Sequence, residues 1–358
     1  MKLKKFFAGV LAAAMMLTVG ATAAFATEPI SVPAGEGDKS YNGAKMFTVD
    51  DPNLELTKEL HVASGTAPDT MKFDFTVKSG AATVATPSVT FDKVDNADGA
   101  AFTADNTYSR KVTINLNEIL GDNKTQVGTY NYTITENDTT IPGITKDNKT
   151  VKMTVTVVNK ESNNLSESTG YGYIVALRNN EDSQKSDGKF TNTYNAYDLM
   201  VKKVVEGNFA DLKDEFTFVI TLDKANGMDN NYANAIVTST NNANNDSAWT
   251  WTADGKAQKE VTLKHNQTAT ISNLPVGVTY TVTEKGADAE GWIYTTVGQI
   301  KDKAAIIAGE NKVEITNTHE GTPDMGVILD NAPYIALLAI VAIGGVALML
   351  NKRRRDEE

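Results

Sequence analysis

Two lysines of this chain fall on the apolar side of a strand pattern, where an amine can react rather than carry a charge. In residues 54–62 every second position is Leu or Val except the one that Lys58 occupies, and Lys203 interrupts residues 199–205 in the same way. Because the side chains of a strand alternate between its two faces, both lysines are predicted to point into a core. Burial disfavours an ammonium ion, so such a lysine tends to become a neutral, nucleophilic amine.

The same alternation test predicts two further inward polar residues for each lysine. Glu136 and Glu284 each end a Tyr-Thr-Ile/Val-Thr-Glu segment and share a face with its apolar residues. Asn192 and Asn317 alternate in the same manner with Phe, Tyr, Val or Ile. The order lysine, glutamate, asparagine therefore occurs twice, which indicates an internal repeat with a shared chemistry.

An amine, a carboxamide and a buried carboxyl group can condense into an amide. The carboxamide is a poor electrophile, but a carboxyl that stays protonated can hydrogen-bond the amide oxygen and then give a proton to the departing ammonia. Folding makes the reaction intramolecular, and proximity supplies much of its rate. The predicted products are two amide bonds, Lys58–Asn192 and Lys203–Asn317, promoted by Glu136 and Glu284.

The common alternative for an inward lysine is that it extends to solvent at a sheet edge or pairs with an acid. Full burial of lysine is rare. The duplicated order of the three residue types nevertheless favours two crosslinks. Each would close a loop on the order of 100 residues, which the chain-entropy treatment equates with about 4–5 kcal/mol of stabilisation.

Composition restricts the class of protein. The 358 residues carry a formal net charge of -11 and no cysteine. Short alternating segments rich in Val, Ile, Thr, Tyr and Phe are separated by Gly, Asn and Asp turns, which predicts an all-β protein of sandwich domains. The acidic balance argues against a nucleic-acid partner. The three histidines are isolated and no phosphate-binding loop is present, so we expect no metal, no cofactor and no turnover enzyme.

Both ends of the chain have targeting features. Basic residues, an apolar run and an Ala-x-Ala site predict a signal peptide over residues 1–26, followed by an irregular N-terminal extension over residues 27–50. A second apolar run, residues 332–350, precedes the basic residues 352–355 and is long enough to span a bilayer. The chain between them is therefore expected at the cell surface.

The repeat defines the domain boundaries. It predicts a first domain over residues 51–195, a second over residues 196–320, and a C-terminal sorting region over residues 321–358. Asn192 lies only a few residues before the strand that carries Lys203. So short a connection predicts a stiff, end-to-end pair of domains.

The motifs around the two triads resemble those of the isopeptide-linked major pilins of Gram-positive bacteria, the streptococcal pilin isopeptide-linkage family. The resemblance implies tandem immunoglobulin-like domains, with Lys–Asn isopeptide bonds at the two triads and Lys203 rather than the outward Lys202 as the second crosslinking lysine. It covers most of the chain after the leader, and its best-matched segments are Leu56-Thr57-Lys58, Phe190-Thr-Asn192, Val201 to Gly207, Asn273-Leu-Pro-Val-Gly-Val278, Tyr280-Thr-Val-Thr-Glu284 and Thr316-Asn317.

The C-terminal region is similar to a cell-wall sorting signal, with the pentapeptide Thr322-Pro323-Asp324-Met325-Gly326 before the apolar run. The resemblance implies that a pilus-specific sortase cleaves between Met325 and Gly326. Thr322 stands where leucine is usual and Met325 where threonine is usual, which bears on which sortase acts. A plain membrane anchor is the alternative for this region.

The resemblance also implies a lysine that accepts the Met325 acyl group of another copy of the chain. Lys185 fits the family's placement, shortly before the crosslinking asparagine, and Lys189 is the competitor. A head-to-tail link that does not close on itself gives an open filament. The expected function is a major pilin, a backbone subunit whose partners are copies of itself, the sortase and, through it, peptidoglycan, with minor pilins as further candidates. The alternative is a monomeric wall-anchored adhesin that binds a host or matrix ligand directly.

Overall fold

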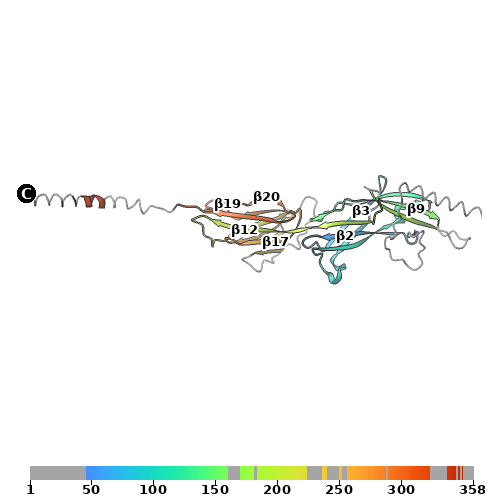
Figure 1. The fold of residues 1–358 in the computed structure, drawn as a ribbon, viewed down its shortest axis with the longest axis horizontal. Helices are drawn as coiled ribbons and strands as arrows, with labels where there is room; N and C mark the ends of the chain where they lie inside the picture. Colours follow the sequence, from blue (N-terminus) through green and yellow to red (C-terminus); the bar gives the residue numbers. More distant parts are fainter. Residues whose placement is uncertain are drawn as a thin grey trace, which may run out of the picture.

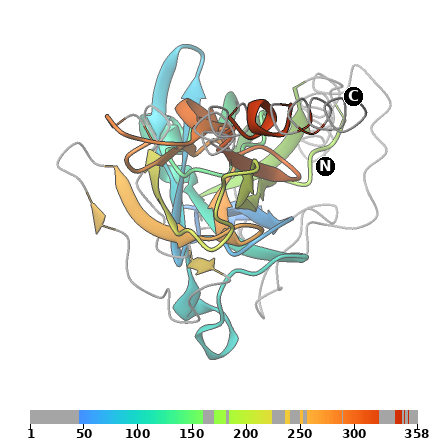
Figure 2. The ribbon, with the colours of Figure 1, turned by 90° about the vertical axis from the view of Figure 1, so that its left-hand side faces the viewer.

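The computed structural model describes residues 46–159, 170–180, 184–223, 236–239, 250–251, 256–287, 289–322, 337–343, 346 and 349. Two β-sandwich domains lie end to end along the long axis of the molecule, with β2, β3 and β9 in the first and β12, β17, β19 and β20 in the second (Figure 1). Figure 2 looks along this axis, and the two domains overlap in projection. The prediction of an all-β chain with two tandem sandwiches is confirmed.

The first domain stacks a larger sheet on a four-stranded one. The larger sheet has the order β1-β10-β9-β7-β3-β4, with β5 also paired to β3, and the smaller has the order β6-β2-β11-β8. The strands are β1 (Met46–Thr48), β2 (Asn53–Val62), β3 (Thr70–Ser79), β4 (Ala82–Ala85), β5 (Ser88–Asp92), β6 (Asn106–Asn115), β7 (Gly128–Glu136), β8 (Ile144–Thr145), β9 (Thr150–Asn159), β10 (Tyr171–Asn179) and β11 (Lys189–Tyr194).

The second domain stacks two five-stranded sheets. Their orders are β14-β17-β12-β21-β19 and β15-β16-β13-β18-β20. The strands are β12 (Ala196–Glu206), β13 (Phe216–Asp223), β14 (Ile236–Ser239), β15 (Thr250–Trp251), β16 (Ala257–Leu263), β17 (Thr268–Pro275), β18 (Thr279–Glu284), β19 (Thr295–Val297), β20 (Ile300–Ala305) and β21 (Asn311–Thr318).

Alternation between buried and exposed residues produces both cores. In β2 the residues at every second position are buried, and the same holds in β9, β13 and β21. The buried apolar side chains form two separate clusters, one for each sandwich. Two-sheet packing of this kind interleaves the inward side chains of both sheets, so an inward polar residue meets the core directly.

Residues 337–343, beyond the second sandwich, are helical, whereas the described helices of the two domains are short and peripheral. They are α2 (Leu116–Leu120), whose N-terminus is capped by the Asn115 side chain, and the 3-10 helices η1 (Lys93–Asp95), η2 (Ala97–Gly99) and η3 (Gly121–Thr125). β1 pairs with the edge strand β10. The segment predicted to be irregular, residues 27–50, therefore contributes the strand Met46–Thr48 to a sheet of the first domain.

A single residue, Asn195, connects the two domains between β11 and β12. Its backbone N–H donates to Gly143 O of the first domain at 2.9 Å, and its carbonyl accepts from Val276 N of the second at 3.0 Å. Gly143 N in turn donates to Val276 O at 3.1 Å. Three chain segments thus interlock by backbone hydrogen bonds, which restrains bending at the junction.

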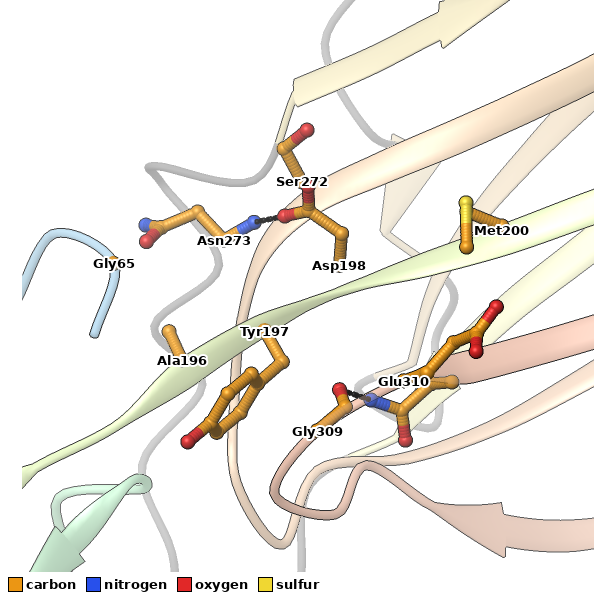
Figure 3. Close-up of a pocket in the computed structure, with 10 residues that line it drawn as sticks. Gly65, Ala196, Tyr197, Asp198, Met200, Ser272, Asn273, Gly309 and Glu310 are labelled. Atoms are coloured by element: carbon orange, nitrogen blue, oxygen red, sulfur yellow. Dashed lines mark hydrogen bonds between the residues drawn. The ribbon is translucent and has the colours of Figure 1, made fainter.

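Asn273 makes a second connection between the domains. Its side-chain oxygen accepts from Thr66 N at 2.6 Å, and its side-chain nitrogen donates to Thr66 O at 3.0 Å. Figure 3 shows this side chain pointing toward Gly65 across a pocket that Ala196 and Tyr197 also line. A Cβ atom on Gly65 would lie 2.5 Å from the Asn273 oxygen, so the close approach requires glycine.

Several predicted segments lie wholly or largely outside the described residues. They are the signal peptide, most of the N-terminal extension, residues 323–326 of the sorting pentapeptide and most of the C-terminal apolar run. Within the described part of the chain, no helix combines the length and the apolar character needed to cross a bilayer.

Candidate functional site

Parallel strand pairing brings each lysine beside its asparagine. In the first domain the opening strand β2 pairs with the closing strand β11, and Lys58 is opposite Phe190, two residues before Asn192. In the second domain β12 pairs with β21, and Lys203 is opposite Ile315, two residues before Asn317. A two-residue offset keeps both side chains on one face of the sheet, so each amine and carboxamide point into the same core.

The glutamate of each site comes from the opposite sheet. Glu136 ends β7, which pairs with β3 so that Glu136 is opposite Phe75. Glu284 ends β18, which pairs with β13 so that Glu284 is opposite Phe218. Each carboxyl group therefore reaches across the sandwich to the lysine and asparagine of the facing sheet.

In the first domain the carboxyl group of Glu136 bridges the amine and the amide. Lys58 Nζ donates to Glu136 Oε2 at 2.7 Å, and Asn192 Nδ2 donates to Glu136 Oε1 at 2.5 Å. Both nitrogen atoms of the proposed condensation thus contact one carboxyl group. That carboxyl can take a proton from one nitrogen and deliver a proton to the other.

The second domain repeats this arrangement. Lys203 Nζ donates to Glu284 Oε2 at 3.2 Å, and Asn317 Nδ2 donates to Glu284 Oε1 at 2.6 Å. Lys202, the neighbouring lysine, instead pairs with Glu314 at 3.2 Å on the partly exposed outer face of the sheet. The structure therefore brings together the two predicted triads and excludes Lys202 from the second.

Burial lowers the pKa of the two lysine amines. The exposed fraction of both Lys58 and Lys203 is 0%. Loss of solvation lowers the pKa of Lys58 below its ordinary value, although the Glu136 carboxylate opposes the shift. The same cause lowers the pKa of Lys203 to about 8, again against the attraction of Glu284. A lowered pKa makes the free amine, which is the nucleophilic form, more accessible near neutral pH.

Aromatic rings line both sites, and the sequence analysis did not assign them a role. Lys58 Nζ lies 5.0 Å from the ring centroid of Phe73, and Lys203 Nζ lies 4.4 Å from that of Phe216. Each ring belongs to a Phe-x-Phe segment whose second phenylalanine is opposite the glutamate. In the sequence, the Phe-x-Phe segment that follows each lysine strand could have indicated that aromatic rings line both sites. The rings help to bury the amine, which favours its neutral form, although a ring face also attracts an ammonium ion.

The orientation of both carboxamides differs from the expected one. We expected each glutamate to hydrogen-bond the amide oxygen, but Glu136 and Glu284 each contact the amide nitrogen. The oxygen, Asn192 Oδ1, instead accepts from the backbone N–H of Asp147 at 2.9 Å. The glutamate is therefore positioned to act on the leaving nitrogen, and a backbone group contacts the oxygen.

The two candidate joining lysines have different surroundings. Lys185 is exposed, and its backbone forms a bridge with Arg178 on β10. Lys189 Nζ pairs with Glu59 Oε1 at 2.9 Å, and this hydrogen bond raises the pKa of Lys189. Lys189 is thus held as an ammonium ion. Of the sorting pentapeptide, only Thr322 is among the described residues.

Comparisons with known proteins agree with this geometry. Residues 54–195 match the family described as the Spy0128-like isopeptide containing domain, and residues 197–319 match a domain family of unknown function, DUF7601. A curated relative, the pilin of Streptococcus pyogenes serotype M1, is 28% identical over 368 residues, which cover 95% of this chain and 98% of the relative. The crystal structure of a mutant of the major pilin from Streptococcus pyogenes has a TM-score of 0.50 at 20% identity, covering 75% of this chain and 99% of that chain.

Fold and site together define a tandem β-sandwich protein with one buried lysine–glutamate–asparagine triad in each domain. The first domain matches the Spy0128-like isopeptide containing domain, and the chain as a whole is similar to a streptococcal pilin. The proteins that it resembles are pilins, a class of structural protein rather than of enzyme.

Proposed function

We propose that this pilin is the backbone subunit of a covalent surface filament and that each of its domains forms its own Lys–Asn amide bond. The single observation that supports the crosslinks best is the carboxyl bridge, because Glu136 and Glu284 each contact both nitrogen atoms that the reaction must change. Its repetition in two domains with the same strand offset argues against a chance ion pair.

The proposed reaction conserves atoms and charge within each triad. Proton transfer from the lysine to the glutamate gives a neutral amine and a carboxylic acid. The lysine nitrogen attacks the asparagine Cγ, a new C–N bond forms, and the bond from Cγ to Nδ2 breaks. In total the carboxyl group passes two protons from the lysine nitrogen to the leaving nitrogen, which departs as an ammonium ion. Each glutamate ends as it began, so it acts as a general acid and base.

The location of the bonds suits a protein under tension. Each bond would join the last strand of a sandwich to a strand near its start, β11 to β2 and β21 to β12, and these strands are already parallel neighbours. A pull on the chain ends would then be carried by the crosslink rather than by the hydrogen bonds between the strands. The interlocked junction at Asn195 would transmit the same load from one domain to the next.

For assembly, we propose that a sortase cleaves after Met325 and transfers the acyl group to Lys185 of another copy, and that the final copy is attached to the wall of a Gram-positive cell. The exposure of Lys185 supports this choice, because an enzyme must reach the acceptor amine. Lys189 is less suitable, because Glu59 raises its pKa and so stabilises the unreactive ammonium form.

The assembly proposal is tested on wall extracts from cells that express the chain together with its sortase. We expect a ladder of SDS-resistant species that Lys185→Arg removes and the matched Lys189→Arg leaves unchanged. A ladder that persists in Lys185→Arg and disappears in Lys189→Arg would transfer the role to Lys189. A single band for the wild-type chain would contradict polymerisation and favour a monomeric wall-anchored adhesin.

A further inference from the structure

The two asparagine side chains differ in what their oxygen atoms contact. Asn192 Oδ1 accepts a hydrogen bond from the backbone N–H of Asp147 at 2.9 Å. Asn317 Oδ1 is buried and has no hydrogen-bond partner among the residues that the structure describes. The triads are otherwise alike, so this contact distinguishes the two reaction sites.

Strand length explains the difference. In the first domain β8 is paired with β11 at Thr193 and Tyr194 and ends before it reaches Asn192. The chain then turns, and the N–H of Asp147 is free to point at the carboxamide. In the second domain the corresponding neighbour, β19, continues past the asparagine, with Thr296 opposite Asn317. Its backbone remains part of the strand pairing instead of turning toward the side chain.

The side chain of Asp147 holds its own backbone in this position. Asp147 Oδ1 accepts from Lys149 N at 2.9 Å, and Asp147 Oδ2 accepts from Thr191 N at 3.0 Å. The second bond connects the turn to β11, one residue before Asn192. The donor is thus fixed before any reaction, as required of a group that stabilises a transition state without reorganising.

We propose that the backbone N–H of Asp147 stabilises the oxyanion during crosslinking of the first domain, and that the second domain, whose described residues provide no such donor to Asn317 Oδ1, forms its bond more slowly. This inference rests on the proposed crosslinks. When Lys58 Nζ attacks the asparagine Cγ, the C=O electron pair moves onto Oδ1, which becomes negative. The Asp147 N–H already donates to that oxygen, so its contribution grows as the charge develops. Asp147 is a positioning residue, and its carboxyl group takes no part in the bond changes.

The expected size follows from other oxyanion donors, whose removal slows reactions by about 10²–10³-fold. Burial lowers the pKa of both Lys58 and Lys203, so the free amine is favoured in both domains. We therefore expect the Lys58–Asn192 bond to form at least about tenfold faster than the Lys203–Asn317 bond in the same chain.

The test follows both bonds in one refolding experiment on the two-domain chain. Chain that has been kept unfolded since synthesis is diluted from denaturant, samples are quenched in acid at intervals, and the crosslinked peptide of each domain is quantified by mass spectrometry. Asp147→Pro removes the N–H, and the matched variant Asp147→Ala removes the same carboxyl group but retains the N–H. Circular dichroism reports whether each variant refolds.

We expect the wild-type first domain to react faster, Asp147→Pro to slow that bond about 10²-fold relative to Asp147→Ala, and neither variant to alter the second bond. Equal rates for the two wild-type bonds, or equal rates for the two variants in the first domain, would overturn the inference while leaving the crosslinks intact. If the proline variant does not refold, the ratio of the wild-type rates decides. Failure of both domains to lose ammonia would instead reject the proposed function.

Discussion

Replacing Glu136 by glutamine exchanges one carboxyl oxygen for nitrogen and should leave the first domain folded without its crosslink. Glutamine fits the same space between Lys58 Nζ and Asn192 Nδ2, but it cannot accept a proton from the amine or deliver one to the leaving nitrogen. The first domain should therefore retain the mass of one ammonia. The second domain, whose triad is separate, should still lose its own.

The loss of stability can be worked from the loop that the bond closes. Lys58 and Asn192 enclose on the order of 130 residues, and the chain-entropy relation equates such a loop with about 5 kcal/mol. The buried Lys58 amine also loses its charged partner, which adds on the order of 1–3 kcal/mol. A total of about 6–8 kcal/mol corresponds to a Tm lower by roughly 12–30 °C for a domain of this size.

The assay combines intact-mass analysis after limited proteolysis with differential scanning calorimetry. Glu55→Gln is the matched control, because Glu55 belongs to the same domain but lies on β2 of the facing sheet, where it is exposed. It should retain both the ammonia loss and the wild-type transition of the first domain. The second domain provides an internal reference, because its transition should be unchanged in either variant.

Two results would refute this reasoning. If the Glu136→Gln first domain still lost ammonia, the carboxyl group would not be the proton carrier. The second result would be a Glu136→Gln first domain that keeps its ammonia, and so lacks the crosslink, but whose Tm falls by only about as much as in Glu55→Gln. The crosslink of the wild-type domain would then contribute little to equilibrium stability. In that case the value of the bond would lie in resistance to force alone.

Two further predictions follow from the second domain and from the junction. In Asn317→Ala no bond can form, so Lys203 stays titratable, with a pKa of about 8 in the folded domain against an ordinary value of 10.5. Between pH 8 and pH 10.5 the unfolded chain therefore binds more protons than the folded chain. The unfolding free energy should rise with pH across that window by up to about 1.4 kcal/mol per pH unit. Denaturant titrations would measure this slope, which should vanish in the crosslinked wild type and in Asn317→Ala combined with Lys203→Met. Asn273→Gly keeps the positive φ of this position but removes both side-chain hydrogen bonds to Thr66. The two domains should then bend at the junction, and small-angle scattering should report a shorter maximum dimension of the molecule. An unchanged scattering profile would mean that the Asn195 backbone hydrogen bonds alone hold the domains in line.

Local alternation alone predicted the most unusual feature of the protein. Lys58, Lys203 and their polar partners were recognised as inward residues because side chains in a strand alternate with period two, whatever the strand pairs with. The same property predicted an all-β chain with two domains. The Asn273-Leu-Pro-Val-Gly-Val segment was recognisable as a motif, but its part in joining the domains was not, because that part depends on contacts with Thr66, more than two hundred residues earlier in the chain.

Only the tertiary structure decided how the inward residues meet. Parallel pairing of β2 with β11 and of β12 with β21, with a two-residue offset between lysine and asparagine, depends on long-range contacts that no local pattern encodes. The Asp147 N–H is a backbone group and carries no signature of residue type, and its position depends on β8 ending two residues early in the fold of one domain but not the other. Side-chain parity is a property of neighbouring residues, whereas register and strand length are set by the packing of whole sheets.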